Sequence, residues 1–114
     1  MSNRAYNVRP MTIIIVGKDG KHSEPKTKYL SVDWPSFNLW HDKDFCDLLS
    51  SCSSFYETLN SDGTGKGSFS REEFEEIKKE LAKKGKLAEN RRLLELVESD
   101  FVETGDDWVE YDCY

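Results

Sequence analysis

Residues 11–34 read MTIIIVGKDGKHSEPKTKYLSVDW and predict a β-hairpin near the start of the chain. The β-branched run of residues 11–17 is typical of a strand that is buried on both faces. Asp19 and Gly20 supply the backbone freedom that a tight hairpin turn requires. Residues 28–34 then alternate apolar and polar side chains, as a half-buried strand does.

A second alternating segment lies at the other end of the chain, at residues 108–113. One set of its side chains is apolar and the other is Trp108, Glu110 and Asp112. This pattern predicts a final strand with one buried face. We expect this strand to return to the N-terminal hairpin and to complete a small antiparallel sheet.

Helices are expected between the hairpin and the final strand. Apolar residues fall on one helical face from about 42 to 59 and again from about 88 to 101. Between these segments, Ser70 and Glu73 have the spacing of a capping box and predict the start of another helix. The fold class that follows is α+β, a single domain over residues 1–114 with a small antiparallel sheet packed against about three helices.

Three aromatic residues follow the hairpin at spacings of three: Trp34, Phe37 and Trp40. Two interpretations fit this spacing. The side chains either fold under the hairpin as a lid on the core, or they form an exposed patch that anchors a partner. The sequence does not distinguish between these interpretations.

The composition is that of a globular chain with one modest core. The chain has 114 residues, of which 33% are charged and 37% are hydrophobic. No apolar run approaches the roughly 20 residues of a membrane span, so we expect no membrane association. The first ten residues lack the apolar stretch of a secretory signal. These features predict a cytoplasmic protein.

No arrangement of catalytic residues stands out. The chain has only two histidines, His22 and His41, and both lie among polar residues. The sequence therefore offers no clear general base for a Ser or Cys nucleophile. Cys46 and Cys52 lack the paired spacing of a zinc site. We therefore expect a protein that is not an enzyme and that carries no cofactor.

Charge is distributed unevenly along the chain. Of the 22 acidic residues, 8 fall in residues 93–114, which contain none of the 16 basic residues. Just before this acidic segment, residues 78–92 hold seven Lys and Arg against Glu80 and Glu89. The sequence therefore predicts a molecule with a basic shoulder and an acidic end.

Three interpretations of this asymmetry are open: a solvated surface that keeps the domain soluble, an acidic interaction surface, or a basic shoulder that binds nucleic acid. The formal net charge of −6 and the lack of a recognised nucleic-acid-binding motif argue against direct binding of nucleic acid. We favour the acidic surface, because interleaved aromatic and acidic residues combine anchoring with electrostatic steering.

The predicted function is that of a non-enzymatic, acidic protein-binding module that docks a basic surface of a protein partner. A nucleic-acid-binding groove is one such surface, because carboxylates can occupy the positions of phosphates in a nucleic-acid mimic. Small inhibitors encoded by phages or mobile elements resemble this chain in size and acidity, which implies an inhibitor or regulator. The expected partner-binding residues are Glu98, Asp100, Glu103, Asp106, Asp107, Trp108, Glu110 and Asp112.

A local resemblance provides an alternative. Residues 45–84 contain an amphipathic helix, a polar glycine-rich loop and a second helix that opens with a Glu-Phe pair, and this arrangement resembles an EF-hand. The resemblance implies that loop oxygens bind calcium. The span from Asn60 to Glu73 is fourteen residues, two more than the EF-hand loop. The metal ligands that the resemblance implies are Asn60, Asp62, Thr64 and Glu73.

Overall fold

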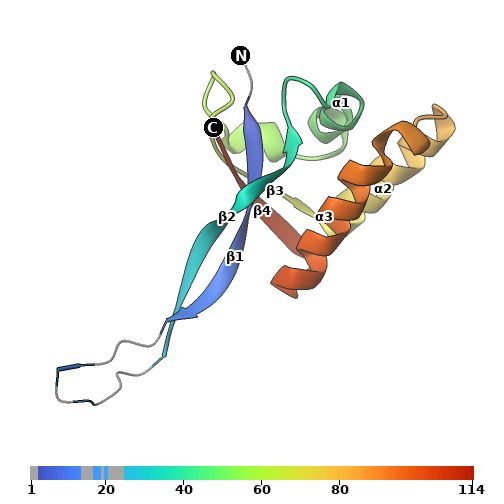
Figure 1. Cartoon of the computed structure of the whole chain (residues 1–114). Helices are drawn as coiled ribbons and strands as arrows, with labels where there is room; N and C mark the ends of the chain where they lie inside the picture. The colour runs from blue at the N-terminus through green and yellow to red at the C-terminus, as the bar shows by residue number, and fades with distance from the viewer. Residues whose placement is uncertain (1–2, 14–16, 19, 21–24) are drawn as a thin grey trace.

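The structure is a computed structural model, and it describes residues 3–13, 17–18, 20 and 25–114. Within these residues, four strands and three α-helices make up the fold (Figure 1). The elements in chain order are β1 (Arg4–Ile13), β2 (Lys26–Asn38), α1 (Lys43–Cys52), the 3-10 turn η1 (Phe55–Thr58), β3 (Gly65–Ser70), α2 (Arg71–Lys83), the 3-10 turn η2 (Ala88–Asn90), α3 (Arg91–Thr104) and β4 (Trp108–Cys113).

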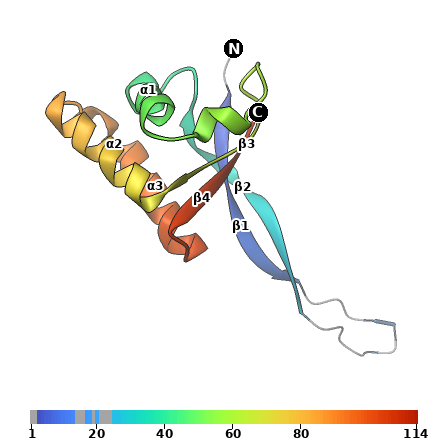
Figure 2. The ribbon, with the colours of Figure 1, turned by 180° about the vertical axis from the view of Figure 1, so that it is seen from behind.

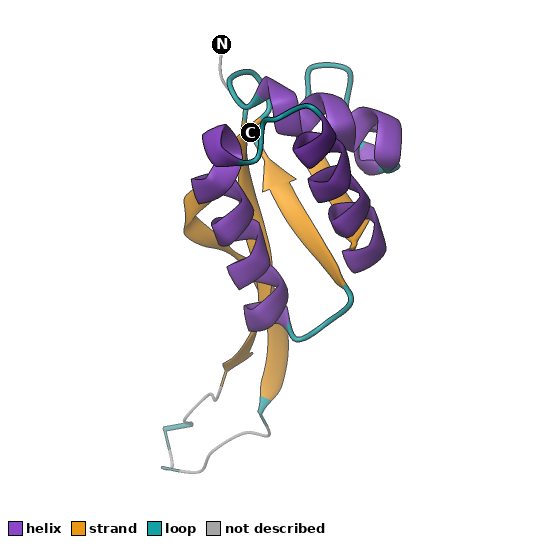
Figure 3. Cartoon of the chain, turned by 90° about the vertical axis from the view of Figure 1, so that its right-hand side faces the viewer, coloured by secondary structure: helices purple, strands orange, loops and turns teal. Residues whose placement is uncertain are grey.

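The four strands form one antiparallel sheet in the order β2-β1-β4-β3. Helices α2 and α3 lie side by side on one face of this sheet (Figure 3). The C-terminal strand pairs with β1, as Asn7 opposite Tyr111 shows. The predicted α+β class and the return of the final strand to the hairpin are therefore confirmed.

Strand β3 is an element that the sequence did not predict, because its sequence GKGSFS combines glycine and serine, which are poor strand formers. Each residue of β3 nevertheless pairs with a residue of β4. Packing against Phe55 requires glycine at position 67, since a Cβ atom there would lie only 2.7 Å from Cε2 of Phe55. The outer edge of β3 is partly covered, because Thr58 Oγ1 donates to the Lys66 carbonyl oxygen at 2.7 Å.

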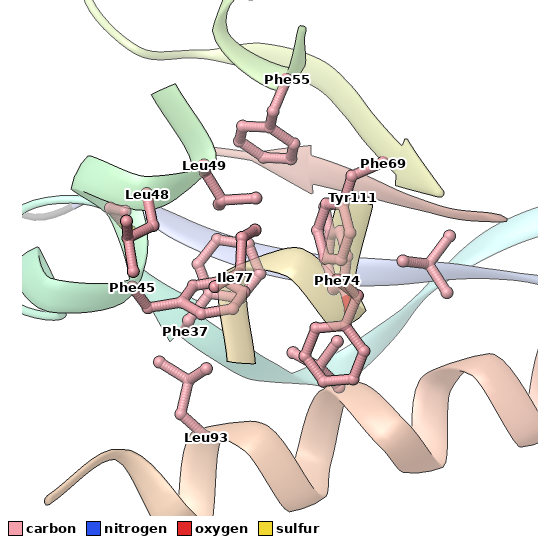
Figure 4. Packing of buried hydrophobic residues seen from close by; sticks show 14 of the residues in the cluster. Phe37, Phe45, Leu48, Leu49, Phe55, Phe69, Phe74, Ile77, Leu93 and Tyr111 are labelled. Carbon is pink, nitrogen blue, oxygen red and sulfur yellow. The ribbon is translucent and has the colours of Figure 1, made fainter. Parts of the chain in front are cut away.

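The core lies between the sheet and the helices and is rich in phenylalanine (Figure 4). Phe69 of β3 stacks on Tyr111 of β4 with ring centroids 5.6 Å apart. Phe74 of α2 stacks on Phe101 of α3 at 5.5 Å, which joins the two long helices above the sheet. Aromatic pairs of this kind add about 0.5–1.5 kcal/mol each beyond the area that they bury.

The helix boundaries follow local capping signals. The predicted capping box is present at the start of α2, where Ser70 Oγ accepts from Glu73 N at 3.1 Å and Glu73 Oε1 accepts from Ser70 N at 2.8 Å. The helix expected from about 42 to 59 ends at Cys52, and a separate 3-10 turn carries Phe55 into the core. The third helix is preceded by η2 and continues to Thr104.

The hairpin strands extend beyond the body of the molecule as an arm (Figures 1 and 2). Met11 and Thr12 lie on this arm and are exposed. The prediction of a strand buried on both faces is therefore wrong for Met11 and Thr12, because neither sheet nor helix covers the arm there. Residues 14–16 of that segment and the turn residue Asp19 lie outside the described residues.

The three aromatic residues after the hairpin divide between the two interpretations. Phe37 is buried in the core, in edge contact with Tyr111 at 4.9 Å between ring centroids. Trp34 and Trp40 are each 49% exposed. The segment is therefore neither a lid on the core nor a single exposed patch.

Candidate binding surface

Asp100, one of the expected partner-binding residues, is part of the core rather than the surface. Its side chain lies between α3 and the sheet, with 1% of the residue exposed. The carboxylate accepts three hydrogen bonds: from Arg9 Nη2 at 2.9 Å, from Ser36 Oγ at 2.5 Å and from the Tyr111 hydroxyl at 2.7 Å. These donors come from β1, β2 and β4, so Asp100 fixes α3 to three strands and has no surface left for a partner.

The groups around Asp100 are themselves held in place. Arg9 Nε donates to Asn7 Oδ1 at 2.8 Å, and the guanidinium carbon lies 5.4 Å from the centroid of the Trp34 ring. Burial, followed by the neighbouring Asp100 charge, raises the pKa of Tyr111 well above its ordinary value. The phenol therefore stays protonated and remains a donor to Asp100. The network is a structural link between the arm and the body.

Glu98 is also engaged within the molecule. It forms an ion pair with Arg71 of α2, and the Arg71 guanidinium lies 4.2 Å from the ring centroid of Phe101. One turn earlier, Glu95 accepts from Arg91 Nε at 3.0 Å. Both pairs are exposed, so each contributes only about 0–1 kcal/mol to stability and can exchange partners.

The remaining expected carboxylates make no ion pair with any residue in the described parts of the chain. Glu103, Asp106 and Asp107 are exposed at the end of α3 and in the loop that follows. Glu110 and Asp112 are half-buried and lie on the β4 face that points away from the helices. The acidic end predicted from the sequence is therefore only partly neutralised by the molecule's own basic residues.

Exposed aromatic side chains lie among these carboxylates. Trp108 is 47% exposed and Tyr29 of β2 is 67% exposed. Together with Asp106 and Glu110 they line a small hollow of about 30 Å³, whose other lining residues are Val8, Pro10 and Thr104. We call this surface, together with the adjoining end of α3, the acidic aromatic patch and define it as Tyr29, Glu103, Asp106, Asp107, Trp108 and Glu110. Glu103 lies at its margin and lines a separate hollow with Arg9 and Trp34.

Tyr29 was missed by the sequence reasoning, since it lies 79 positions from Trp108 in the chain. Antiparallel pairing of β1 with both β2 and β4 brings them together. The alternation of residues 28–34 could have indicated that Tyr29 is exposed, because it places Tyr29 on the polar face of its strand. Asp112 lies two positions beyond Glu110 on the same face of β4 and pairs across the sheet with Lys66, at the margin of the patch.

The end of α3 adds negative potential to the patch. The C-terminal pole of a helix is equivalent to roughly half a negative charge, and basic residues in the last turn usually offset it. The last turn of α3 contains no basic residue, and Glu103 lies within it. Asp106 and Asp107 follow directly after the capping Gly105. Like charges therefore accumulate here, in an arrangement that a cationic partner would stabilise.

Of the four residues implied by the EF-hand resemblance, Asn60, Asp62 and Thr64 are brought together in one turn, and Glu73 is not. Asp62 Oδ1 accepts from Thr64 N at 3.0 Å and from Thr64 Oγ1 at 2.6 Å, and these bonds lower the pKa of Asp62. Asn60 Nδ2 donates to Thr64 Oγ1 at 3.1 Å. Glu73 instead caps α2 on the far side of β3, which spans six residues or roughly 20 Å.

The expected calcium loop is therefore a tight turn followed by a strand. Glu73 is unavailable to close a metal site around Asp62 because its carboxylate holds the backbone of Ser70. Within the described ranges, no group of three or more His, Cys, Asp or Glu side chains is arranged to hold a metal ion.

The cysteines are free thiols in the structure. Burial raises the pKa of Cys46 and of Cys113 to about 12. Both side chains are therefore neutral near pH 7, and a neutral thiol is a poor nucleophile.

None of the described helices has the length and apolar character needed to cross a membrane. Comparison of the chain with protein-family models, with curated proteins and with solved structures gives no match.

Proposed function

We propose that this chain is a non-enzymatic binding protein, an inhibitor or regulator, that docks a basic protein surface through the acidic aromatic patch. The observation that carries the proposal is the set of carboxylates at the end of α3 and on β4 that lack an ion pair within the described residues, with the exposed Trp108 beside Asp106 and Glu110.

The two kinds of side chain have separate roles in this proposal. The carboxylates, together with the negative end of α3, attract a basic partner and speed the encounter. Trp108 and Tyr29 supply apolar area that is buried on contact, and tryptophan and tyrosine are the residues most often found as binding hot spots. The network around Asp100 keeps β1, β4 and α3 in a fixed arrangement, so the patch is formed before the partner arrives.

A nucleic-acid-binding groove is the class of basic surface that we favour for the partner. Such a groove is lined with Lys and Arg that contact phosphates. The patch offers carboxylates along a strand and at a helix end, and these would take the places of the phosphates. If the partner binds nucleic acid through this groove, DNA or RNA should compete with the chain for it.

The experiment compares two double charge reversals with the same change in net charge. Glu103→Lys with Asp106→Lys alters the patch, whereas Asp47→Lys with Glu76→Lys alters exposed acidic residues of α1 and α2 that make no described ion pair. A partner captured from host extract is purified, and its Kd is measured with each variant.

We expect the patch variant to bind at least about tenfold more weakly, which is about 1.4 kcal/mol, and the α1–α2 variant to bind like the unmodified chain. Equal weakening by both variants would show a general effect of net charge. Unchanged binding by the patch variant would place the contact elsewhere. Either result would remove the proposal.

A further inference from the structure

A mostly apolar groove lies between α2 and α3, outside the acidic aromatic patch. Its volume is about 330 Å³, and Leu87, Ala88 and Leu94 form its apolar lining. Leu87 is 40% exposed, although it is a large apolar side chain. The remaining lining residues are Lys78, Arg91, Glu95 and Glu98. An apolar surface of this kind, rimmed by charged residues, is typical of an interaction site.

The charges that line the groove are balanced, Lys78 and Arg91 against Glu95 and Glu98, but the segment that flanks it at Leu87 is rich in basic residues. Residues 78–92 hold seven Lys and Arg, and we call this segment the basic shoulder. Four of the seven form ion pairs, each with a glutamate three or four positions away on the chain. Lys79, Lys84 and Arg92 form none with the residues that the structure describes, and Arg92 lines a separate hollow with Arg4 and Asp42.

The groove and the acidic aromatic patch lie toward opposite ends of α3. The helix runs from Arg91 to Thr104, a rise of roughly 20 Å over 14 residues. One end therefore presents an apolar groove beside the basic shoulder, and the other presents the exposed Trp108 beside Asp106 and Glu110. Because the length of α3 separates them, a molecule does not bring its own two surfaces together. Two copies can.

We propose that the groove between α2 and α3 binds the acidic aromatic patch of a second copy of this chain. Trp108 of one copy covers Leu87 and Leu94 of the other, while Asp106 and Asp107 face the basic shoulder. Each copy uses a different surface in this contact, so the association is head-to-tail and does not close at two subunits. The free groove and the free patch at the ends of a dimer accept further copies.

The proposal does not rest on the existence of a foreign partner, although it uses the same patch. Self-association would cover the patch and would compete with a basic partner. The groove residues take no part in the proposed partner contact. A groove variant therefore separates the two ideas, because it removes self-association and leaves the partner contact intact, so partner binding is kept or strengthened.

The test uses sedimentation velocity over a range of protein concentrations at low and high salt. The groove variant is Ala88→Glu, and its matched control is Ala82→Glu, an exposed alanine of α2 that does not line the groove. The unmodified chain and the control should increase in mass with concentration at low salt, and salt should reverse the increase. The groove variant should remain at the monomer mass of 13.2 kDa.

The decisive experiment mixes the groove variant with the patch variant. The Ala88→Glu chain keeps its patch, and the Glu103→Lys with Asp106→Lys chain keeps its groove. Each alone should be monomeric, and their equimolar mixture should form a species of twice the monomer mass and no larger. A monomeric unmodified chain at every concentration, equal loss in the Ala82→Glu control, or a mixture that stays monomeric would each overturn the proposal.

Discussion

Replacing Asp100 with alanine tests how the sheet and α3 are held together. The substitution removes the acceptor of three hydrogen bonds and leaves Arg9 without its ionic partner. Removing one member of a buried ion pair typically costs about 3–5 kcal/mol. Arg9 keeps its bond to Asn7 and has 16% of its side chain exposed, so part of the charge penalty is relieved. We therefore expect a loss of about 3 kcal/mol in the free energy of unfolding.

Urea denaturation followed by circular dichroism measures this loss. The matched control is Glu98→Ala, two positions earlier on the same helix, which breaks the exposed ion pair with Arg71. An exposed pair contributes about 0–1 kcal/mol, so the control should remain close to the unmodified chain. If Asp100→Ala costs no more than Glu98→Ala, the buried network does not hold α3 on the sheet, and the reasoning is refuted.

Three further predictions concern the core and the capping box. The free energy of unfolding should fall as pH rises from 9 towards 12, by about 1.4 kcal/mol per unit per thiol, because Cys46 and Cys113 ionise near 9.0 when unfolded and near 12 when folded. A double alanine variant should lose this slope between pH 9 and 10, below the range in which the raised pKa values of Tyr56 and Tyr111 add a slope of the same sign, and a slope that persists there in urea titrations would contradict the assignment. Gly67→Ala should lower stability by about 1–3 kcal/mol through the clash with Phe55; a companion Phe55→Leu change should recover part of it in thermal melts, and no recovery would point to another cause. Ser70→Ala should cost about 1 kcal/mol through loss of the capping box, equally with and without added calcium. A cost that depends on calcium would revive the metal interpretation.

Local signals in the sequence predicted most of the elements. The capping box at Ser70 and Glu73 located the start of α2 because both groups act within one turn of the chain. Alternation at residues 108–113 identified β4 and its buried face. Strand β3 escaped prediction because its residues form a strand through pairing with β4 and packing of Phe69. Neither contact is visible in a local pattern.

The candidate surface was predicted in part. The charge count located the acidic end, but it treated all eight carboxylates as equivalent. Only the fold separates Asp100, which faces three strands, from Asp106, which faces solvent. The resemblance to an EF-hand failed for a related reason. Composition suggested a ligand loop, whereas the chain uses Glu73 to cap a helix and extends Gly65–Ser70 as a strand.

The rate of association with the partner, measured by stopped flow at several salt concentrations, tests the central claim most directly. If the acidic aromatic patch steers a basic partner, the rate should fall steeply with added salt. Reversing Glu103 and Asp106 should lower the rate and flatten its salt dependence, whereas reversing Asp47 and Glu76 should leave both close to those of the unmodified chain. A rate that does not change with salt, or that falls equally in both variants, would contradict the account.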